Sequence, residues 1–154
     1  TLSSSSAASD VYKRQGEIMA IINESSIGET QFQKILGHHH IYKEWNNLAN
    51  NLEKTSYLSA QVKEEIRRML AQKNHCQYCK AKGKPRGIFG NEKEQICIGL
   101  VEVYMKVGDR IPHEIIQLLK QNLTKAEIVE LFAFISFTNC QQQFGALMKL
   151  NPSD

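Results

Sequence analysis

Two cysteines at CxxC spacing are the residues of this chain best able to do chemistry. Cys76 and Cys79 are separated by Gln77 and Tyr78. Thiols at that spacing can close a small disulfide ring or share a metal ion. Residues three apart on a helix lie on the same face, so a short helical turn opened by Cys76 would bring the two sulfurs within bonding reach.

Basic residues directly follow this pair, in a segment that also contains several glycines. The basic residues are Lys80, Lys82, Lys84 and Arg86. A neighbouring cation lowers the pKa of a thiol below its ordinary value of about 8.5. The free amide groups at the start of a helix also favour the thiolate of either cysteine. The pattern is typical of a reactive cysteine.

A metal site and a pair without chemistry stay open as alternatives. A structural zinc ion needs two further ligands, usually a second closely spaced pair, but Cys97 and Cys140 each stand alone. Histidines that could in principle converge on a metal are His38, His39, His40 and His113. A c-type haem requires histidine directly after the second cysteine, where Lys80 stands. We favour a redox pair, with no metal and no cofactor.

Composition indicates one ordinary globular core. Of the 154 residues, 42% are apolar and 23% are charged, which suffices for one core but not for two. The net charge of +3 is small and the two signs are interleaved, so we expect no nucleic-acid partner. Apolar stretches such as 131–137 are far shorter than the roughly 20 residues that cross a bilayer. With few cysteines and no membrane segment, we expect a soluble, cytoplasmic protein.

The chain divides into a tail and one domain. Residues 1–15 are rich in serine and alanine and lack helical periodicity, which predicts disorder. This run also resembles a translated adapter sequence, which would leave it without function. We expect residues 16–154 to form a single helical domain.

Beyond the tail, apolar residues recur every three or four positions and no segment alternates, which predicts an all-α fold. Helices are expected over 30–36, 39–52, 59–74, 91–107 and 124–150, with another beginning near Pro112. Two capping boxes are expected, Asn91 with Glu94 and Thr124 with Glu127.

The expected inward faces follow from the same spacing. In 39–52 they are Ile41, Trp45, Leu48 and Leu52, and in 59–74 they are Val62, Ile66, Met69 and Leu70. Residues 128–137 are apolar on nearly all sides, which is typical of the central helix of a bundle.

Residues 62–79 contain a Lys63-Glu64 step followed by the element Asn74-His-Cys-Gln-Tyr-Cys79. This resembles the core motif of the carboxymuconolactone decarboxylase and alkylhydroperoxidase D-like family, in which a Lys-Glu or Arg-Glu step precedes Asn-x-Cys-x-Tyr-Cys. Residues 123–131, 137–139 and 144–147 resemble that family's last helix. Residues 38–40 fall where its members often carry histidines. The resemblance covers about 32–152.

The resemblance implies an alkylhydroperoxidase D-like helical bundle that oligomerises as a homo-trimer or homo-hexamer. Family members with the CxxC pair are thiol peroxidases, whereas the lactone decarboxylases generally lack it. By this resemblance Cys79 attacks a hydroperoxide and becomes a sulfenic acid, and Cys76 then closes the disulfide. A dithiol reductant protein resets the pair. Glu64 matches the glutamate that starts a proton relay.

Two positions depart from the family pattern. Peroxidase members commonly place a histidine four residues beyond the second cysteine, where this chain has Gly83, and Gln143 stands where members often have arginine. On a straight helix Glu64 would also lie about 18 Å from Cys76, so it can assist only if the chain turns back at 74–75 or if water bridges the gap. A non-catalytic helical assembly module and a lactone decarboxylase-like lyase therefore stay open as functions.

Several of these residues also have interpretations without chemistry. Glu64 and Arg68 are four apart in the order that favours a helical ion pair. Cys97 and Cys140 flank apolar helix positions and are expected to be small buried hydrophobic residues. The three consecutive histidines point in three directions around a helix, so we expect them at the surface or at a subunit interface.

Overall fold

The computed structural model describes residues 20–87 and 90–152. These residues form seven helices and contain no strand, which confirms the all-α prediction for this part of the chain. The helices are α2 (Gln31–Leu36), α3 (Tyr42–Glu53), α4 (Ala60–Lys73), α5 (Gln77–Ala81), α6 (Glu92–Val107), α7 (His113–Asn122) and α8 (Lys125–Leu147). The predicted tail 1–15 lies outside the described residues.

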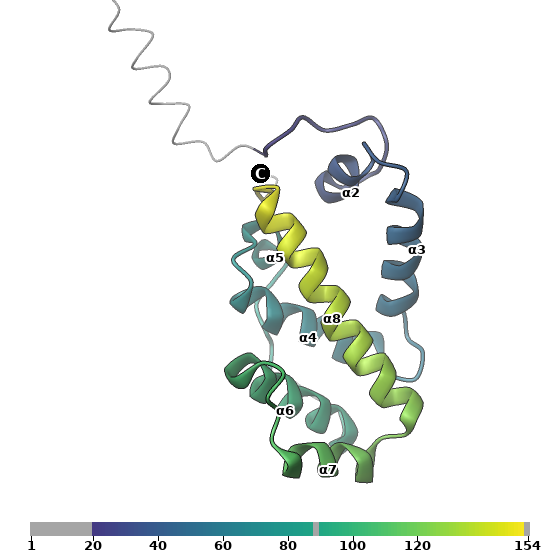
Figure 1. The fold of residues 1–154 in the computed structure, drawn as a ribbon, viewed down its shortest axis with the longest axis vertical. Coiled ribbons are helices and arrows are strands. Elements are labelled where there is room, and N and C mark those ends of the chain that lie inside the picture. The colour runs from purple at the N-terminus through teal and green to yellow at the C-terminus, as the bar shows by residue number, and fades with distance from the viewer. Residues whose placement is uncertain (1–19, 88–89, 153–154) are drawn as a thin grey trace, which may run out of the picture.

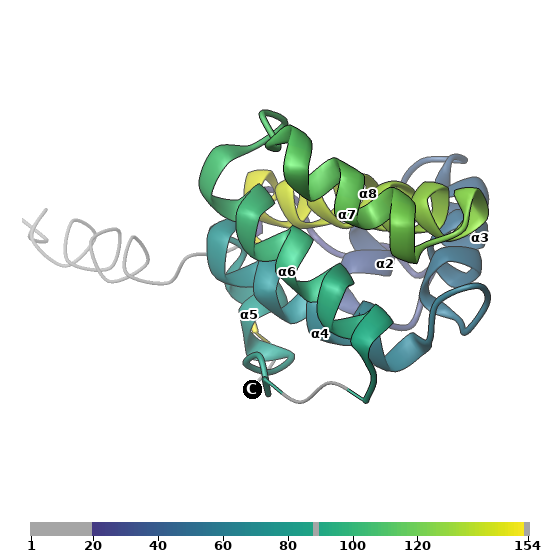
Figure 2. The same cartoon turned by 90° about the horizontal axis from the view of Figure 1, so that it is seen from below.

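Helix α4 occupies the centre of the bundle. It contacts α3, α5, α6 and α8, and α7 joins α6 to α8. Figure 1 shows α8 running diagonally across α4, with α3 to one side and α5 near the far end of α8. Figure 2 shows α6 beside α4 with α7 nearest the viewer. The predicted inward face of α4 is correct, because its members are all buried: Val62, Ile66, Met69 and Leu70.

Helix starts coincide with side-chain caps that the sequence predicted. Thr124 Oγ1 accepts from the Glu127 N–H at 3.2 Å, and the Glu127 carboxylate accepts from the Thr124 N–H at 2.8 Å, which completes the capping box of α8. At α6, Asn91 Oδ1 accepts from the Glu94 N–H at 2.9 Å, but the Glu94 carboxylate accepts from the Gly90 N–H instead. The second box is therefore only half formed.

The predicted inward face of α3 is only partly correct. Trp45 packs into an aromatic cluster with Phe32, Phe137 and Phe144. Ile41 and Leu48 are exposed, however, and Ala49 is the buried residue of the helix. The difference arises because the helices that contact α3, namely α2, α4 and α8, lie along the side that carries Trp45 and Ala49.

Helix α8 forms one wall of the bundle rather than its centre. It buries Leu131, Phe134 and Ile135 on one side. The opposite side is exposed, and its residues from Val129 to Leu147, here called the outer stripe, carry no charge: Val129, Ala133, Ser136, Cys140, Gln143 and Leu147. Lys125, one turn before Val129, continues the same face with a charge. Cys140 is therefore exposed, contrary to the prediction, whereas Cys97 is buried as expected. None of the described helices combines the length and apolar character needed to cross a membrane.

A buried ion pair between Lys63 and Glu130 fastens α4 to α8. Their side chains are 1% and 10% exposed. Lys63 Nζ also donates to the Lys54 carbonyl at 2.8 Å, and the Glu130 carboxylate accepts from the N–H groups of Tyr57 and Leu58 at 3.1 and 3.2 Å. Burial raises the pKa of Glu130, but these donors and the Lys63 charge outweigh it and lower that pKa overall. The pair thus also holds the connection between α3 and α4.

We expect Glu130→Ala to lower the free energy of unfolding by about 3 kcal/mol or more, measured by urea denaturation. The change leaves the buried Lys63 charge without its counterion and two backbone donors without their acceptor, and removing one member of a buried pair costs roughly 3–5 kcal/mol. Glu102→Ala, at an exposed position of α6, serves as the control and stays within about 0.5 kcal/mol of the parent. Equal losses in the two variants would contradict the role of the pair.

Candidate redox-active site

Cys76 and Cys79 form a disulfide at the start of α5. Their Cα atoms are 5.2 Å apart, within the range usual for disulfides. Cys76 is the N-cap of α5, and its Sγ accepts from the Cys79 N–H at 3.2 Å. The bond spans one helical turn, as the CxxC spacing predicted.

The chain turns back between α4 and α5 because Asn74 is held by α8. Asn74 Nδ2 donates to Asn139 Oδ1 at 2.7 Å and to Gln142 Oε1 at 2.8 Å. Gln142 is buried, and its Nε2 donates to the Arg67 carbonyl at 3.0 Å. This turn, one of the two ways in which the sequence allowed Glu64 to reach the cysteines, sets α5 against the C-terminal part of α8.

Helix α8 passes so close to the disulfide that only glycine fits at the point of contact. A Cβ at Gly145 would lie 2.8 Å from Cys76 Sγ and 3.6 Å from Cys79 Sγ. Cys76 is 0% exposed, and Leu150 and Tyr78 pack in the same apolar cluster. The side of the disulfide that faces α8 is therefore closed to solvent.

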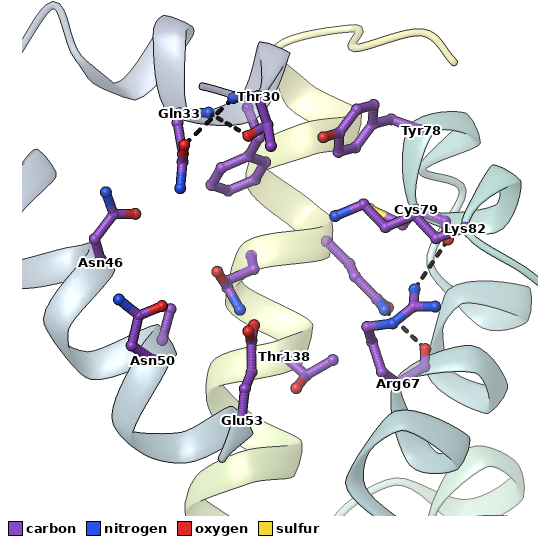
Figure 3. A pocket seen from close by; sticks show the side chains of 14 residues that line it. Thr30, Gln33, Asn46, Asn50, Glu53, Arg67, Tyr78, Cys79, Lys82 and Thr138 are labelled. Atoms are coloured by element: carbon purple, nitrogen blue, oxygen red, sulfur yellow. Dashed lines mark hydrogen bonds between the residues drawn. The ribbon is translucent and has the colours of Figure 1, made fainter. Parts of the chain in front are cut away.

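Cys79, in contrast, lines a cavity of about 220 Å³, whereas Cys76 does not. Cys79 is 7% exposed. Figure 3 shows Asn46 and Asn50 of α3 on one side of the cavity and Cys79, Lys82 and Arg67 on the other. A molecule that enters the cavity therefore meets Cys79 first.

Glu64 is linked to this site through Arg67. The Glu64 carboxylate accepts from Arg67 Nε and Nη2, both at 2.7 Å, and from Arg68 Nε at 2.9 Å. Arg67 Nη1 donates to the Cys79 carbonyl at 3.1 Å. Burial raises the pKa of Glu64, but the hydrogen bonds and positive charges of the two arginines outweigh it and lower that pKa. The ion pair with Arg68 is as predicted, and the proton-relay role of Glu64 stays a prediction.

Arg68 lies against Gly83, where peroxidases of the resembled family carry a histidine. Gly83 has φ +127°, and a Cβ there would lie 3.1 Å from Arg68 Cζ. Arg68 Nη1 also donates to the Lys84 carbonyl at 3.1 Å, and the Glu65 carboxylate accepts from the Arg86 N–H at 2.8 Å. The loop after α5 is thus held against α4, and a side chain at position 83 would require both a strained positive φ and a displacement of the Arg68 guanidinium.

No protein-family model and no curated protein sequence matches this chain. The family resemblance therefore stays an expectation that depends on the motif residues.

The other candidate ligands and thiols lie apart from the disulfide. His38, His39 and His40 are exposed, as predicted. Within 20–87 and 90–152, no three histidine, cysteine or acidic side chains gather as a metal site would require. Burial, together with the charges of Glu127 and Glu94, raises the pKa of Cys97 to about 11, so this thiol is poorly reactive.

Sequence reasoning did not single out Arg67, Gln142 or Gly145. Arg67 carried a usable signal, because it follows Glu64 by three residues on the same helical face. Gly145 carried another, since a glycine inside a long helix often marks a close packing contact. Gln142 carried none, because a buried glutamine looks like an exposed one in sequence.

We expect Gly145→Ala to destabilise the oxidised protein, against the usual preference of helices for alanine. Alanine normally stabilises a helix interior by roughly 0.8–1 kcal/mol relative to glycine. Here the added methyl group would overlap Cys76 Sγ, and overpacking of this kind costs roughly 1–3 kcal/mol. Urea denaturation without reductant measures the difference.

Gly99→Ala provides the matched control. Gly99 lies inside α6, and a Cβ there meets nothing within 4 Å. This variant is expected to be more stable than the parent by up to about 1 kcal/mol. The close contact at Gly145 is refuted if the two alanine variants are equally stable.

Proposed function

We propose that this protein is a thiol-dependent peroxidase that reduces hydroperoxides through Cys76 and Cys79. The asymmetry of the pair carries the proposal: Cys79 lines a cavity, and Cys76, bonded to it, is fully buried. A peroxidase of this kind needs one sulfur that meets the oxidant and a second that is protected from it but within bonding reach. The family resemblance of residues 62–79 supports the same assignment.

In the oxidative half of the proposed cycle, the Cys79 thiolate attacks the terminal oxygen of a hydroperoxide. The O–O bond breaks, Cys79 becomes a sulfenic acid, and the alkoxide takes a proton from water to leave as an alcohol. The Cys76 thiol then attacks the Cys79 sulfur, and the sulfenic oxygen leaves as water. The pair has lost two electrons and forms the disulfide.

In the reductive half, an external thiolate attacks Cys79, the sulfur that lines the cavity. The disulfide breaks and Cys76 leaves with the electron pair. The Cys79 N–H, which donates to Cys76 Sγ, stabilises the departing thiolate. A second thiol then releases Cys79 and is itself oxidised. The cycle needs a reducing compartment, which agrees with the expected cytoplasmic location.

Cations rather than an imidazole assist Cys79 in this proposal. Lys82 and Arg67 line the same cavity as Cys79, and positive charge favours the thiolate. Arg67 is a positioning residue, because Glu64 orients its guanidinium and its Nη1 holds the Cys79 carbonyl. Gly83 offers no side chain for proton transfer, so protons come from solvent.

We expect Cys79→Ser to abolish hydroperoxide consumption in a stopped-flow assay of the reduced protein. Cys76→Ser still reacts, but only once per chain, because its sulfenic acid has no partner with which to close a disulfide. A dimedone adduct on Cys79, seen by mass spectrometry, identifies that product.

Cys140→Ser is the control, since Cys140 is exposed on the outer stripe of α8 and the cycle does not use it. It is expected to keep the parent rate. If Cys79→Ser consumes hydroperoxide as fast as the parent, the peroxidase assignment fails. A non-catalytic helical assembly module then becomes the better interpretation.

We also propose that the protein forms a homo-oligomer, a trimer or hexamer, through the outer stripe of α8. This face lacks charge from Val129 to Leu147, and these two residues at its ends are 68% and 73% exposed. Surfaces depleted of charge and rich in exposed apolar side chains are typical of subunit contacts.

Ala133→Arg is expected to convert the oligomer to monomer, because it places a charge at the middle of the uncharged stripe. Native mass spectrometry measures the subunit number. Glu102→Arg, on the exposed side of α6, is the control and is expected to keep the parent assembly. A parent that is already monomeric would contradict this proposal.

A further inference from the structure

The cavity beside Cys79 presents polar side chains that are not used to hold the fold. Asn46, Asn50, Glu53 and Lys82 line it, and their side chains make no hydrogen bond or ion pair with any residue that the structure describes. Gln142 differs, because both ends of its amide are engaged by Asn74 and Arg67. Some polar groups of the cavity lining thus hold the fold together, and others are available to bind a ligand.

The polar side chains without a partner lie on two walls of the cavity, with the negative charge on one wall and the positive charge on the other. Asn46, Asn50 and Glu53 follow one another on one face of α3, at spacings of four and three. Lys82 lies on the opposite side, next to Cys79 (Figure 3), with its Nζ 4.7 Å from the centroid of the Tyr78 ring. The guanidinium of Arg67 is already engaged by Glu64, which it shares with Arg68, and by the Cys79 carbonyl. The cavity therefore offers a carboxylate on one wall, an ammonium beside the reactive sulfur, and two amides on the face of α3.

The lining excludes some ligand classes. An apolar chain, such as that of a lipid, would cover the two asparagines and Glu53 without satisfying them, which is costly. A side-chain amide both donates and accepts, which matches the peptide group. The cavity volume of about 220 Å³ is below the roughly 300–1,000 Å³ of drug-sized sites, so it encloses only a short part of a ligand, whose ends lie at the exposed lining residues Asn50, Glu53 and Lys82.

Because the structure holds the disulfide, the molecule that this cavity receives in the oxidised state is the reductant. Cys79 is only 7% exposed, so the flat surface of a folded dithiol protein meets it less readily than a ligand that enters the cavity. A short, flexible thiol can enter.

We propose that the reductant of the Cys76–Cys79 disulfide is a short peptide thiol that carries both an ammonium and a carboxylate group. Glu53 binds its ammonium, Lys82 binds a carboxylate beside the sulfur, and Asn46 and Asn50 bind its amide groups. This deepens the proposed function, on which it rests, and it replaces the dithiol protein that the family resemblance implies.

The chemical steps balance with two molecules of the peptide thiol. The first thiolate forms a bond to Cys79 Sγ, the Cys76–Cys79 bond breaks, and Cys76 leaves as a thiolate that takes up a proton. The second thiolate attacks the peptide sulfur of this mixed disulfide. Cys79 leaves as a thiolate, and the two peptides depart as their own disulfide.

The test compares four thiols as reductants of the oxidised protein, with rates divided by the thiolate concentration of each. Glutathione carries both charges and amides, cysteamine only the ammonium, 3-mercaptopropionate only the carboxylate, and 2-mercaptoethanol neither. Glutathione is expected to show a saturating rate that exceeds the 2-mercaptoethanol rate by about tenfold, the ratio that corresponds to 1.4 kcal/mol. Acid quenching, alkylation and mass spectrometry count the reduced chains.

Substitutions on the two walls are expected to lower the ratio of the glutathione rate to the 2-mercaptoethanol rate toward one. Glu53→Gln and Lys82→Met each remove one charge, and Asn50→Ala removes one amide. Glu44→Gln and Lys106→Met, at exposed positions outside the cavity, are the controls and keep the parent ratio. Using a ratio cancels any effect of a substitution on the intrinsic reactivity of Cys79.

Three results overturn the inference. The first is a ratio of the glutathione rate to the 2-mercaptoethanol rate that is near one in the parent, and the second is a ratio that the wall substitutions leave unchanged. The third is that thioredoxin reduces the disulfide faster than glutathione at equal concentration, at a rate that these substitutions do not affect. Calorimetry with S-methylglutathione, which cannot reduce a disulfide, tests recognition separately. If this analogue binds the parent but not Glu53→Gln while hydroperoxide is not consumed, the peroxidase proposal fails and the recognition site stands.

Discussion

The site depends on the buried side-chain amide of Gln142. A buried amide must have partners for both its donor and its acceptor, and here Oε1 accepts from Asn74 while Nε2 donates to the Arg67 carbonyl. These two bonds align α8 with the last turns of α4 and with the reversal that follows. Gly145, one helical turn beyond Gln142, then lies over Cys76, and the Arg67 guanidinium reaches the Cys79 carbonyl. The location of the disulfide thus follows from one buried polar contact.

The charged residues 63–65 of α4 hold neighbouring helices and loops in place rather than take part in the chemistry. Lys63 pairs with Glu130, Glu64 with two arginines, and Glu65 with the backbone of the loop after α5. Each charge offsets the cost of its burial through a defined partner. This matters for the proposed cycle, because a carboxylate whose pKa is lowered by two arginines accepts a proton poorly at neutral pH. Glu64 therefore suits the orientation of Arg67 better than the transfer of protons.

Sequence predicted the features of this chain that depend on local contacts. The helix starts followed from caps such as Thr124 and Asn91, and the disulfide from the CxxC spacing, because each requires only residues a few positions apart. It did not predict which apolar faces are covered, since that depends on helices distant in sequence. Leu48 and Cys140 were expected inside and are exposed for this reason. The contact of Arg68 with Gly83 belongs to the same class, because it requires knowing that the loop after α5 folds back over α4.

The redox pair lies in an apolar cluster of its own, separate from the main core. The main core joins α4, α6, α7 and α8, whereas the smaller cluster gathers Cys76, Cys79 and Tyr78 with Ile35, Ala71 and Leu150. Helix α5 has only five residues, too few to be stable without tertiary contacts. Opening the disulfide would remove one of those contacts and leave the main core untouched, since parts of a protein open with different free energies. Because α5 carries Cys79, a change in the redox state of the pair alters the stability of this cavity wall and leaves the supporting helical bundle unchanged.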